Sequence, residues 1–162
     1  MDLSGDARTL WDAAVALARA AAPVSPRPLP PLLFFTDPVR TPEPWRTAER
    51  LPEGAGLVYR GFGAPDADVV GRRLRRITTD RGVRLLIGLD ADLAERIEAD
   101  GVHLPERAAD QATALRARRP DWLLTAACHL PEGAAPQGLD ALVLSPIFPA
   151  GGPSAAKPAL GV

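Results

Sequence analysis

The chain has 162 residues, 46% of them apolar and 24% charged, and its 19 basic and 20 acidic residues give a formal net charge of −1. This composition is ordinary for one globular domain with its own core, and it offers none of the basic surface that binds nucleic acid. The single cysteine, Cys128, excludes an intrachain disulfide framework and a metal site built from several cysteines, and fits the cytoplasm, where we expect the protein to reside.

The first 31 residues are predicted to form a helix followed by a stiff connector. The helix covers residues 6–22, and Pro23 ends it. Its apolar face carries Leu10, Ala14, Leu17 and Ala18. The connector "PVSPRPLPP" has five prolines in nine residues. Charges interrupt any signal-peptide core here, and no later run reaches the roughly 20 apolar residues of a membrane span, so we expect no membrane partner.

From residue 32 onwards, short apolar runs alternate with helix-like segments. The runs are 32–37, 56–62, 83–90, 101–105, 122–129 and 141–146. Runs of this length without polar alternation are typical of parallel strands covered on both faces. Helical patterns lie between them at 67–82, at 90–101 with Gly101 closing the helix, and at 107–120, with weaker ones at 41–50 and 130–138. The repetition predicts a (β/α) barrel or a doubly wound sheet, and no G-x-G-x-x-G follows the first run, which disfavours dinucleotide binding.

Polar side chains stand at or just past the carboxyl ends of these runs. They are Asp37, Arg60, Asp90, His103, His129 and Ser145. In a βα barrel this rim binds the substrate, so the set is a candidate site whose members share one mouth of the barrel. Each of these residues, and Cys128, could instead have a purely structural role. Asp37 and Asp90 would suit turns or helix caps, His103 a satisfied, partly buried imidazole, and Cys128 a small buried filler.

Four motifs in chain order resemble the thiamine phosphate synthases and the related TenI-type thiazole tautomerases. "LFFTD" (33–37) resembles the family's Y-x-V-T-D, and "ADGVHLPE" (99–106) resembles A-D-G-V-H-L-G-Q. "LTAACHLPEG" (124–133) resembles G-V-S-x-H-S-x-E-E, and residues 139–161 resemble A-D-Y-V-x-x-G-P-V-F-P-T-x-S-K-x-x-x-x-P-x-G. The resemblance implies a TIM-barrel-like α/β fold at 32–162, with about six βα units of a (β/α)8 barrel after the extra helix of 1–31. It also implies a role in thiamine biosynthesis.

Two activities follow from the resemblance. The synthase joins a pyrimidine diphosphate to a thiazole phosphate, with Mg²⁺ clamping the leaving pyrophosphate, whereas the tautomerase shifts a proton on a thiazole phosphate carboxylate and needs a general acid/base. Of the family's diphosphate-binding trio only Arg60 is kept, since Val58 and Phe62 replace a Gln and a Lys. Leu89 and Ala108 stand where the family has Mg²⁺ carboxylates, so we expect no bound Mg²⁺ and no other cofactor.

The matching positions also assign roles. His129 aligns with the tautomerase's histidine and is the candidate general acid/base, because an imidazole both donates and accepts protons near neutral pH. Arg60, His103 and Ser145 are candidates for binding the substrate. The loop after the sixth run is the candidate for binding its phosphate, through Gly151, Gly152, Ser154 and Lys157.

Other interpretations stay open for the site and for the chain as a whole. His129 could instead cap a short helix, and the loop after the sixth run could be a flexible linker. The whole chain could be a non-catalytic relative that binds a small phosphorylated ligand or has a regulatory role. By the resemblance, the chain stops before the family's seventh and eighth strands. We therefore expect its open sheet edges to be covered by the N-terminal helix or by a second copy of the chain.

Overall fold

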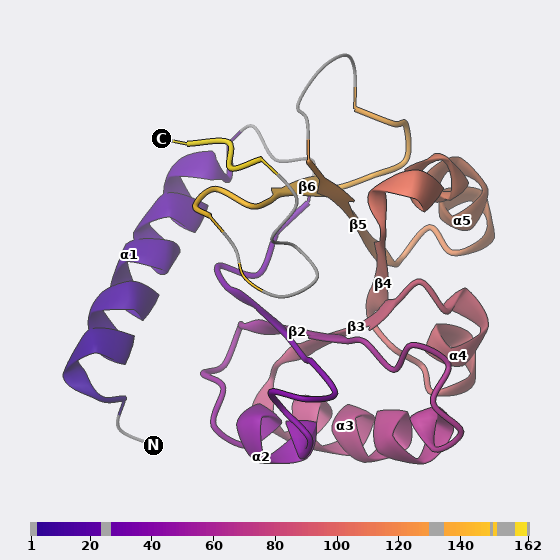
Figure 1. Ribbon diagram of the computed structural model, residues 1–162, viewed down its shortest axis with the longest axis horizontal. Helices are drawn as coiled ribbons and strands as arrows, with labels where there is room; N and C mark the ends of the chain where they lie inside the picture. The colour runs from indigo at the N-terminus through magenta and orange to yellow at the C-terminus, as the bar shows by residue number, and fades with distance from the viewer. Residues whose placement is uncertain (1–2, 24–26, 130–134, 150, 152–157, 162) are drawn as a thin grey trace.

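Six parallel strands form a single curved sheet in the structure, a computed structural model that describes residues 3–23, 27–129, 135–149, 151 and 158–161 (Figure 1). The strands are β1 (Leu33–Phe35), β2 (Gly56–Tyr59), β3 (Arg84–Gly88), β4 (Gly101–Leu104), β5 (Leu123–Cys128) and β6 (Ala141–Leu144). Their spatial order follows the sequence from β1 to β6. A doubly wound sheet reverses its strand order, so this alternative is wrong. The expected TIM-barrel-like α/β fold is confirmed, as an open half-barrel.

Helices in the connections cover the outer face of the sheet (Figure 1). They are α2 (Pro44–Ala48), α3 (Ala67–Arg81), α4 (Ala91–Arg96), the 3₁₀ helix η1 (Glu106–Gln111) and α5 (Ala112–Arg118). The segment expected to be one helix at 107–120 is therefore divided between η1 and α5. In the weak pattern at 130–138, residues 130–134 lie outside the described residues and 135–138 are not helical.

The helix expected at 90–101 is shorter than its sequence pattern. It ends at Arg96, and Glu98 adopts the left-handed conformation with φ 56°. Gly101 does not close this helix, as the sequence pattern indicated, but begins β4 opposite Leu123. A Cβ on Gly101 would lie 2.7 Å from the carbonyl carbon of Leu123, so a glycine lets β4 and β5 approach.

The core has two parts, one on each face of the sheet. Along β2, Leu57 and Tyr59 belong to the larger outer cluster, which packs against the helices, while Val58 belongs to a smaller inner cluster. This is the period-two alternation of a strand. The inner cluster also contains Leu86 and Leu123, and the proline-rich connector contributes Leu29 to it. The connector therefore packs into the half-barrel.

Asp140 joins several segments at the amino ends of the strands. Its side chain is 4% exposed, and its Oδ2 accepts hydrogen bonds from the N–H of Leu124 at 2.8 Å and from Arg116 at 2.6 Å. Arg27 of the connector lies 3.3 Å from Oδ1 and also donates to the carbonyl oxygen of Pro120 at 2.6 Å. These contacts hold the connector, α5, β5 and β6 together at the amino-terminal end of the barrel. That end generally serves the stability of the fold.

The same arrangement occurs two strands earlier in the sheet, between β3 and β4. Oδ2 of Asp100, just before β4, accepts hydrogen bonds from the N–H of Leu85 in β3 at 2.7 Å and from Arg75 in α3 at 2.8 Å. In both cases an aspartate before one strand binds the neighbouring strand's backbone and an arginine of the preceding helix. These links fix the stagger of the strands, and thereby the positions of their opposite, carboxyl ends.

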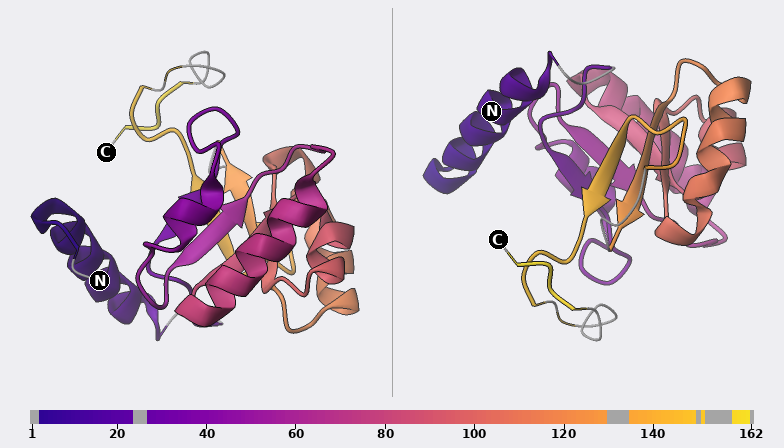
Figure 2. Two further views of the ribbon diagram at one scale, coloured as in Figure 1. Left: turned by 90° about the horizontal axis from the view of Figure 1, so that it is seen from below. Right: turned by 90° about the horizontal axis from the view of Figure 1, so that it is seen from above.

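The N-terminal helix α1 (Gly5–Ala21) lies to one side of the sheet, away from α3 and α5 (Figure 2). None of its residues is buried, and Leu10 and Leu17 of its expected apolar face are 60% and 71% exposed. α1 therefore does not cover a sheet edge by close packing, and coverage by a second copy stays a prediction. Within the described ranges, no helix combines the length and the apolar character needed to cross a membrane.

Candidate functional site

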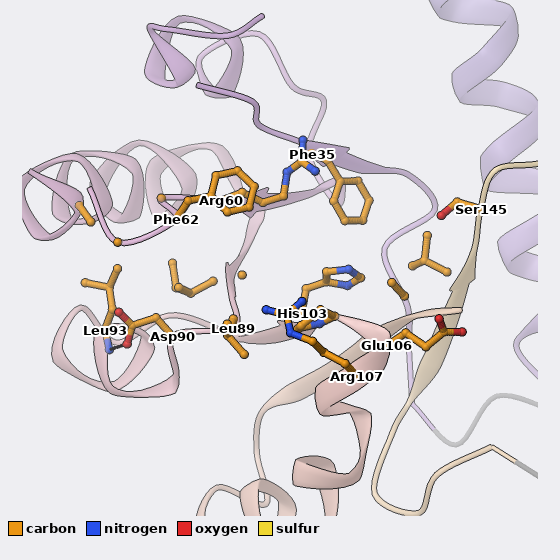
Figure 3. A pocket seen from close by; sticks show the side chains of 18 of the residues that line it. Phe35, Arg60, Phe62, Leu89, Asp90, Leu93, His103, Glu106, Arg107 and Ser145 are labelled. Atoms are coloured by element: carbon orange, nitrogen blue, oxygen red, sulfur yellow. Dashed lines mark hydrogen bonds between the residues drawn. The ribbon is translucent and has the colours of Figure 1, made fainter. Parts of the chain in front are cut away.

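A cavity of about 1060 Å³ opens at the carboxyl ends of the strands (Figure 3). All four residues expected to act as catalyst or to bind the substrate line it, namely Arg60, His103, His129 and Ser145. They come from the ends of β2, β4, β5 and β6, so the expectation that they share one mouth of the barrel agrees with the structure. Their individual roles stay predictions.

Arg60 is held firmly at this cavity. Its Nε donates a hydrogen bond to the carbonyl oxygen of Thr36 at 2.6 Å, and one terminal nitrogen lies 3.5 Å from Oδ2 of Asp37. Its guanidinium carbon also lies 6.0 Å from the centre of the Phe35 ring and 5.5 Å from that of the Phe62 ring. These contacts fix the side chain while leaving further N–H groups to meet a ligand.

Asp37 and Asp90 both accept hydrogen bonds from backbone N–H groups, which fits the interpretation of these residues as turn or helix-cap residues. Oδ1 of Asp37 accepts hydrogen bonds from the N–H groups of Val39 and Arg40, each at 3.0 Å. These two bonds, that of Arg40 first, lower the pKa of Asp37 below its usual value. Oδ1 of Asp90 accepts from the N–H of Leu93 at 2.8 Å and so caps α4. Of the two, Asp90 lines the cavity.

His103 is a buried, neutral imidazole in the inner wall. The residue is 8% exposed, its Nδ1 lies 2.9 Å from Oγ1 of Thr125, and its ring meets Phe35 edge-on at 4.9 Å between centres. Burial, with a smaller contribution from the Arg60 charge, lowers the pKa of His103 from 6.5 to about 4. At neutral pH the imidazole that lines the cavity is therefore uncharged.

His129 is oriented by two contacts. Its Nδ1 lies 2.6 Å from the carbonyl oxygen of Ser145, and its backbone N–H donates to Oε1 of Glu106 at 2.7 Å. Because a carbonyl oxygen only accepts hydrogen bonds, Nδ1 carries the ring proton and Nε2 carries the lone pair of the neutral ring. Ser145 thus contributes its carbonyl group here. Cys128 precedes His129 and, by strand alternation, points to the other face, where it is 8% exposed.

Sequence reasoning missed several residues around the cavity. Phe35 follows from strand alternation, since it lies on the inner face of β1 with Leu33. Arg107 lies in η1, within the segment 107–120 where the sequence pattern indicated a helix and no site residue. Sequence reasoning places Phe62 and Leu89 at family ligand positions but does not predict their conformation. They have positive φ angles of 47° and 66° and expose apolar side chains at the cavity, and no sequence signal marks that backbone conformation.

The loop expected to bind phosphate is largely outside the described residues. Gly152, Ser154 and Lys157 all lie there, while Gly151 is exposed and is not among the residues that line the cavity. Beyond the loop the chain returns, because the N–H of Leu160 donates to the carbonyl oxygen of Pro146 at 2.9 Å. Phosphate binding by this loop stays a prediction.

The donor set at the cavity does not suit Mg²⁺, which takes six oxygen ligands in near-octahedral geometry. Its two carboxylates, those of Asp90 and Glu106, each accept a backbone N–H. Arg107 adds a positive charge to the same wall. Throughout the described part of the chain, no three His, Cys, Asp or Glu side chains gather as they would around a metal ion.

Comparison with protein families and with curated proteins gives matches to thiamine phosphate synthases. A family model described as thiamine monophosphate synthase matches residues 49–162. The chain is 37% identical over 83 residues to a putative thiamine-phosphate synthase of Geobacter sulfurreducens, covering 49% of this chain and 39% of that protein. It is 33% identical over 99 residues to the thiamine-phosphate synthase of Geobacillus kaustophilus, covering 59% of this chain and 44% of the relative. The chain thus spans about two fifths of the length of these relatives.

A solved structure gives the same result at the level of the fold. The thiamine phosphate pyrophosphorylase from Pyrococcus furiosus superposes with a TM-score of 0.66 at 24% identity, covering 80% of this chain and 64% of that one. At this identity the superposition establishes the barrel architecture alone.

Proposed function

The chain belongs to the thiamine monophosphate synthase family, as its four motifs indicated, and we propose that it acts in thiamine biosynthesis on a thiazole phosphate bound in the cavity. The proposed reaction is a tautomerisation with His129 as general acid/base. The observation that supports this role is the 2.6 Å hydrogen bond from Nδ1 of His129 to the carbonyl oxygen of Ser145. This bond fixes the tautomer in which Nε2 carries the lone pair of the ring, the atom that a general base uses to accept a proton.

The proton transfer is balanced without a co-reactant. Nε2 of His129 takes a proton from one ring position of the thiazole, and the electron pair of the broken bond shifts the double bond. The imidazolium then returns the proton to a second ring position. The Ser145 carbonyl orients the ring through Nδ1, and Glu106 holds the backbone of His129. Arg60, from the end of β2, and neutral His103, from β4, the strand next to β5, bind the substrate beside His129.

The transferase reaction of the named relatives is the competing function. Release of pyrophosphate in that reaction needs strong stabilisation of the leaving group, which the family obtains from Mg²⁺. The cavity's carboxylates are bound to backbone N–H groups, and Leu89 and Ala108 offer no oxygen. The donor set therefore favours the metal-independent proton shift. A third possibility is a relative that binds a thiazole or pyrimidine phosphate without turnover.

The test is a tautomerisation assay on a thiazole phosphate carboxylate with wild type, His129→Ala and His103→Ala. We expect His129→Ala to lower kcat by about 10²- to 10⁴-fold, the usual contribution of general acid/base catalysis. His103→Ala should act mainly on KM. Full kcat in His129→Ala would refute the assignment.

Two further measurements separate the alternatives. Mg²⁺-dependent coupling of a pyrimidine diphosphate to the thiazole phosphate would establish the transferase instead. Calorimetric binding of the thiazole phosphate without turnover would establish the non-catalytic relative.

A further inference from the structure

Arg107 places a second guanidinium in the cavity. It belongs to η1 and is exposed, and its side chain enters the cavity on the side opposite Arg60 (Figure 3). The side chain of Arg107 forms no hydrogen bond or ion pair with any residue that the structure describes. Several other arginines of the described surface are paired with carboxylates, as Arg72 is with Asp68 at 2.7 Å. The donors of Arg107 therefore meet solvent or a ligand.

The two guanidiniums offer hydrogen-bond donors to an anion from opposite sides of the cavity. Arg60 is partly offset by Asp37, 3.5 Å away, so it does not supply a full unbalanced charge. Asp90 and Glu106 each accept a backbone N–H with one carboxylate oxygen, which holds these carboxylates in place at the cavity. The Arg107 side chain, unlike that of Arg60, has no ion-pair partner among the described residues. Its planar fork of N–H groups matches the oxygens of a phosphate, which it can bind through two parallel hydrogen bonds.

We propose that Arg107 and Arg60 together hold the anionic group of the ligand from opposite sides, so that a phosphate or diphosphate binds without a divalent cation. The phosphorylated nature of the ligand rests on the proposed function. The role of Arg107 rests on its position in the cavity and on the unsuitable Mg²⁺ donor set. In this arrangement a side chain supplies the charge that a metal ion would otherwise bring to the site.

The experiment is calorimetric titration with inorganic pyrophosphate in buffer containing EDTA, and again with excess Mg²⁺. We expect wild type to bind in EDTA and Arg107→Ala to bind about 10- to 100-fold more weakly, the loss expected for a charge-assisted hydrogen bond. Arg107→Lys keeps the charge without the fork and should fall between the two. Arg76→Ala, which removes the same charge from an exposed position on α3 outside the cavity, is the matched control and should bind like wild type.

The inference is overturned if wild type binds pyrophosphate only when Mg²⁺ is present, or does not bind it under either condition. It is also overturned if Arg107→Ala binds as wild type does, or if Arg76→Ala weakens binding equally, because net charge alone would then be responsible. Its failure is distinct from that of the proposed function. A protein that binds pyrophosphate in EDTA through Arg107 but does not tautomerise a thiazole phosphate keeps the inference and refutes the proposed reaction.

Discussion

Acidification should destabilise this protein through His103. In the folded state the pKa of His103 is lowered from 6.5 to about 4, with burial as the main cause and the Arg60 charge as the second. Between these values the unfolded chain binds the proton and the folded chain does not. Stability is therefore complete above pH 6.5 and is lost as the pH falls toward 4. At about 1.4 kcal/mol for each unit of pKa, the full loss is on the order of 3 kcal/mol.

The measurement is urea unfolding followed by tryptophan fluorescence at several pH values from 7 to 4, for wild type and His103→Gln. The glutamine is uncharged throughout, so the variant should lose the part of the pH dependence due to His103 and approach wild type as the pH falls. The chain has two histidines, and His129→Gln is the matched control for removing an imidazole. Carboxylates that titrate near pH 4 affect all three proteins, so the comparison is the difference between them at each pH.

The result that would refute this reasoning is an unchanged pH dependence in His103→Gln. The imidazole would then protonate equally well in the folded and unfolded chains, which means that water reaches it. Its contacts with Thr125 and Phe35 would have to open for that to occur.

Two further predictions concern stability. Gly101→Ala should lower the free energy of unfolding in urea by on the order of 3 kcal/mol or more, because its Cβ would meet the backbone of Leu123. Gly5→Ala, with open space around its Cβ, is the control and should change that free energy by no more than about 0.5 kcal/mol. Equal effects of the two substitutions would refute the steric argument. Asp140→Asn should cost about 3 kcal/mol, since it leaves Arg116 without its nearly buried carboxylate, and a midpoint unchanged from wild type would show that the pair contributes nothing.

The strands were predictable from sequence, but their ends were less so. Every expected run contains an observed strand, because uninterrupted apolar segments suit a sheet covered on both faces. The first run was expected to extend to Asp37, yet β1 ends at Phe35. The reason is local. The Asp37 carboxylate accepts hydrogen bonds from the N–H groups of Val39 and Arg40, so the chain turns here and leaves the sheet. A polar residue at a strand end thus marks the strand's position but not the residue at which pairing stops.

Helix lengths were the weaker part of the prediction. The apolar residues at 90–101 have the spacing of a helix. The last two residues of this segment, however, contact β3 and β5, and they could not do so in a helical conformation. Asp100 binds the N–H of Leu85, and Gly101 pairs with Leu123. Tertiary contacts of this kind override local propensity, and a sequence alone does not show them.

The chemistry of the cavity depends on differences that sequence could not give. His103 and His129 were both placed at strand ends, yet only the structure separates them. His103 lies within β4, so the sheet and Phe35 exclude water and keep its ring neutral. His129 lies one residue past the end of β5, where the Ser145 carbonyl holds one ring nitrogen and the other carries the lone pair. Two identical side chains at neighbouring strand ends therefore differ in what they can do, because one is enclosed by packing and the other is oriented by a backbone carbonyl. A general acid/base must gain and lose its proton during each turnover. The ring whose burial opposes a positive charge is the poorer candidate, and the ring whose tautomer and orientation a backbone carbonyl fixes at the cavity is the better one.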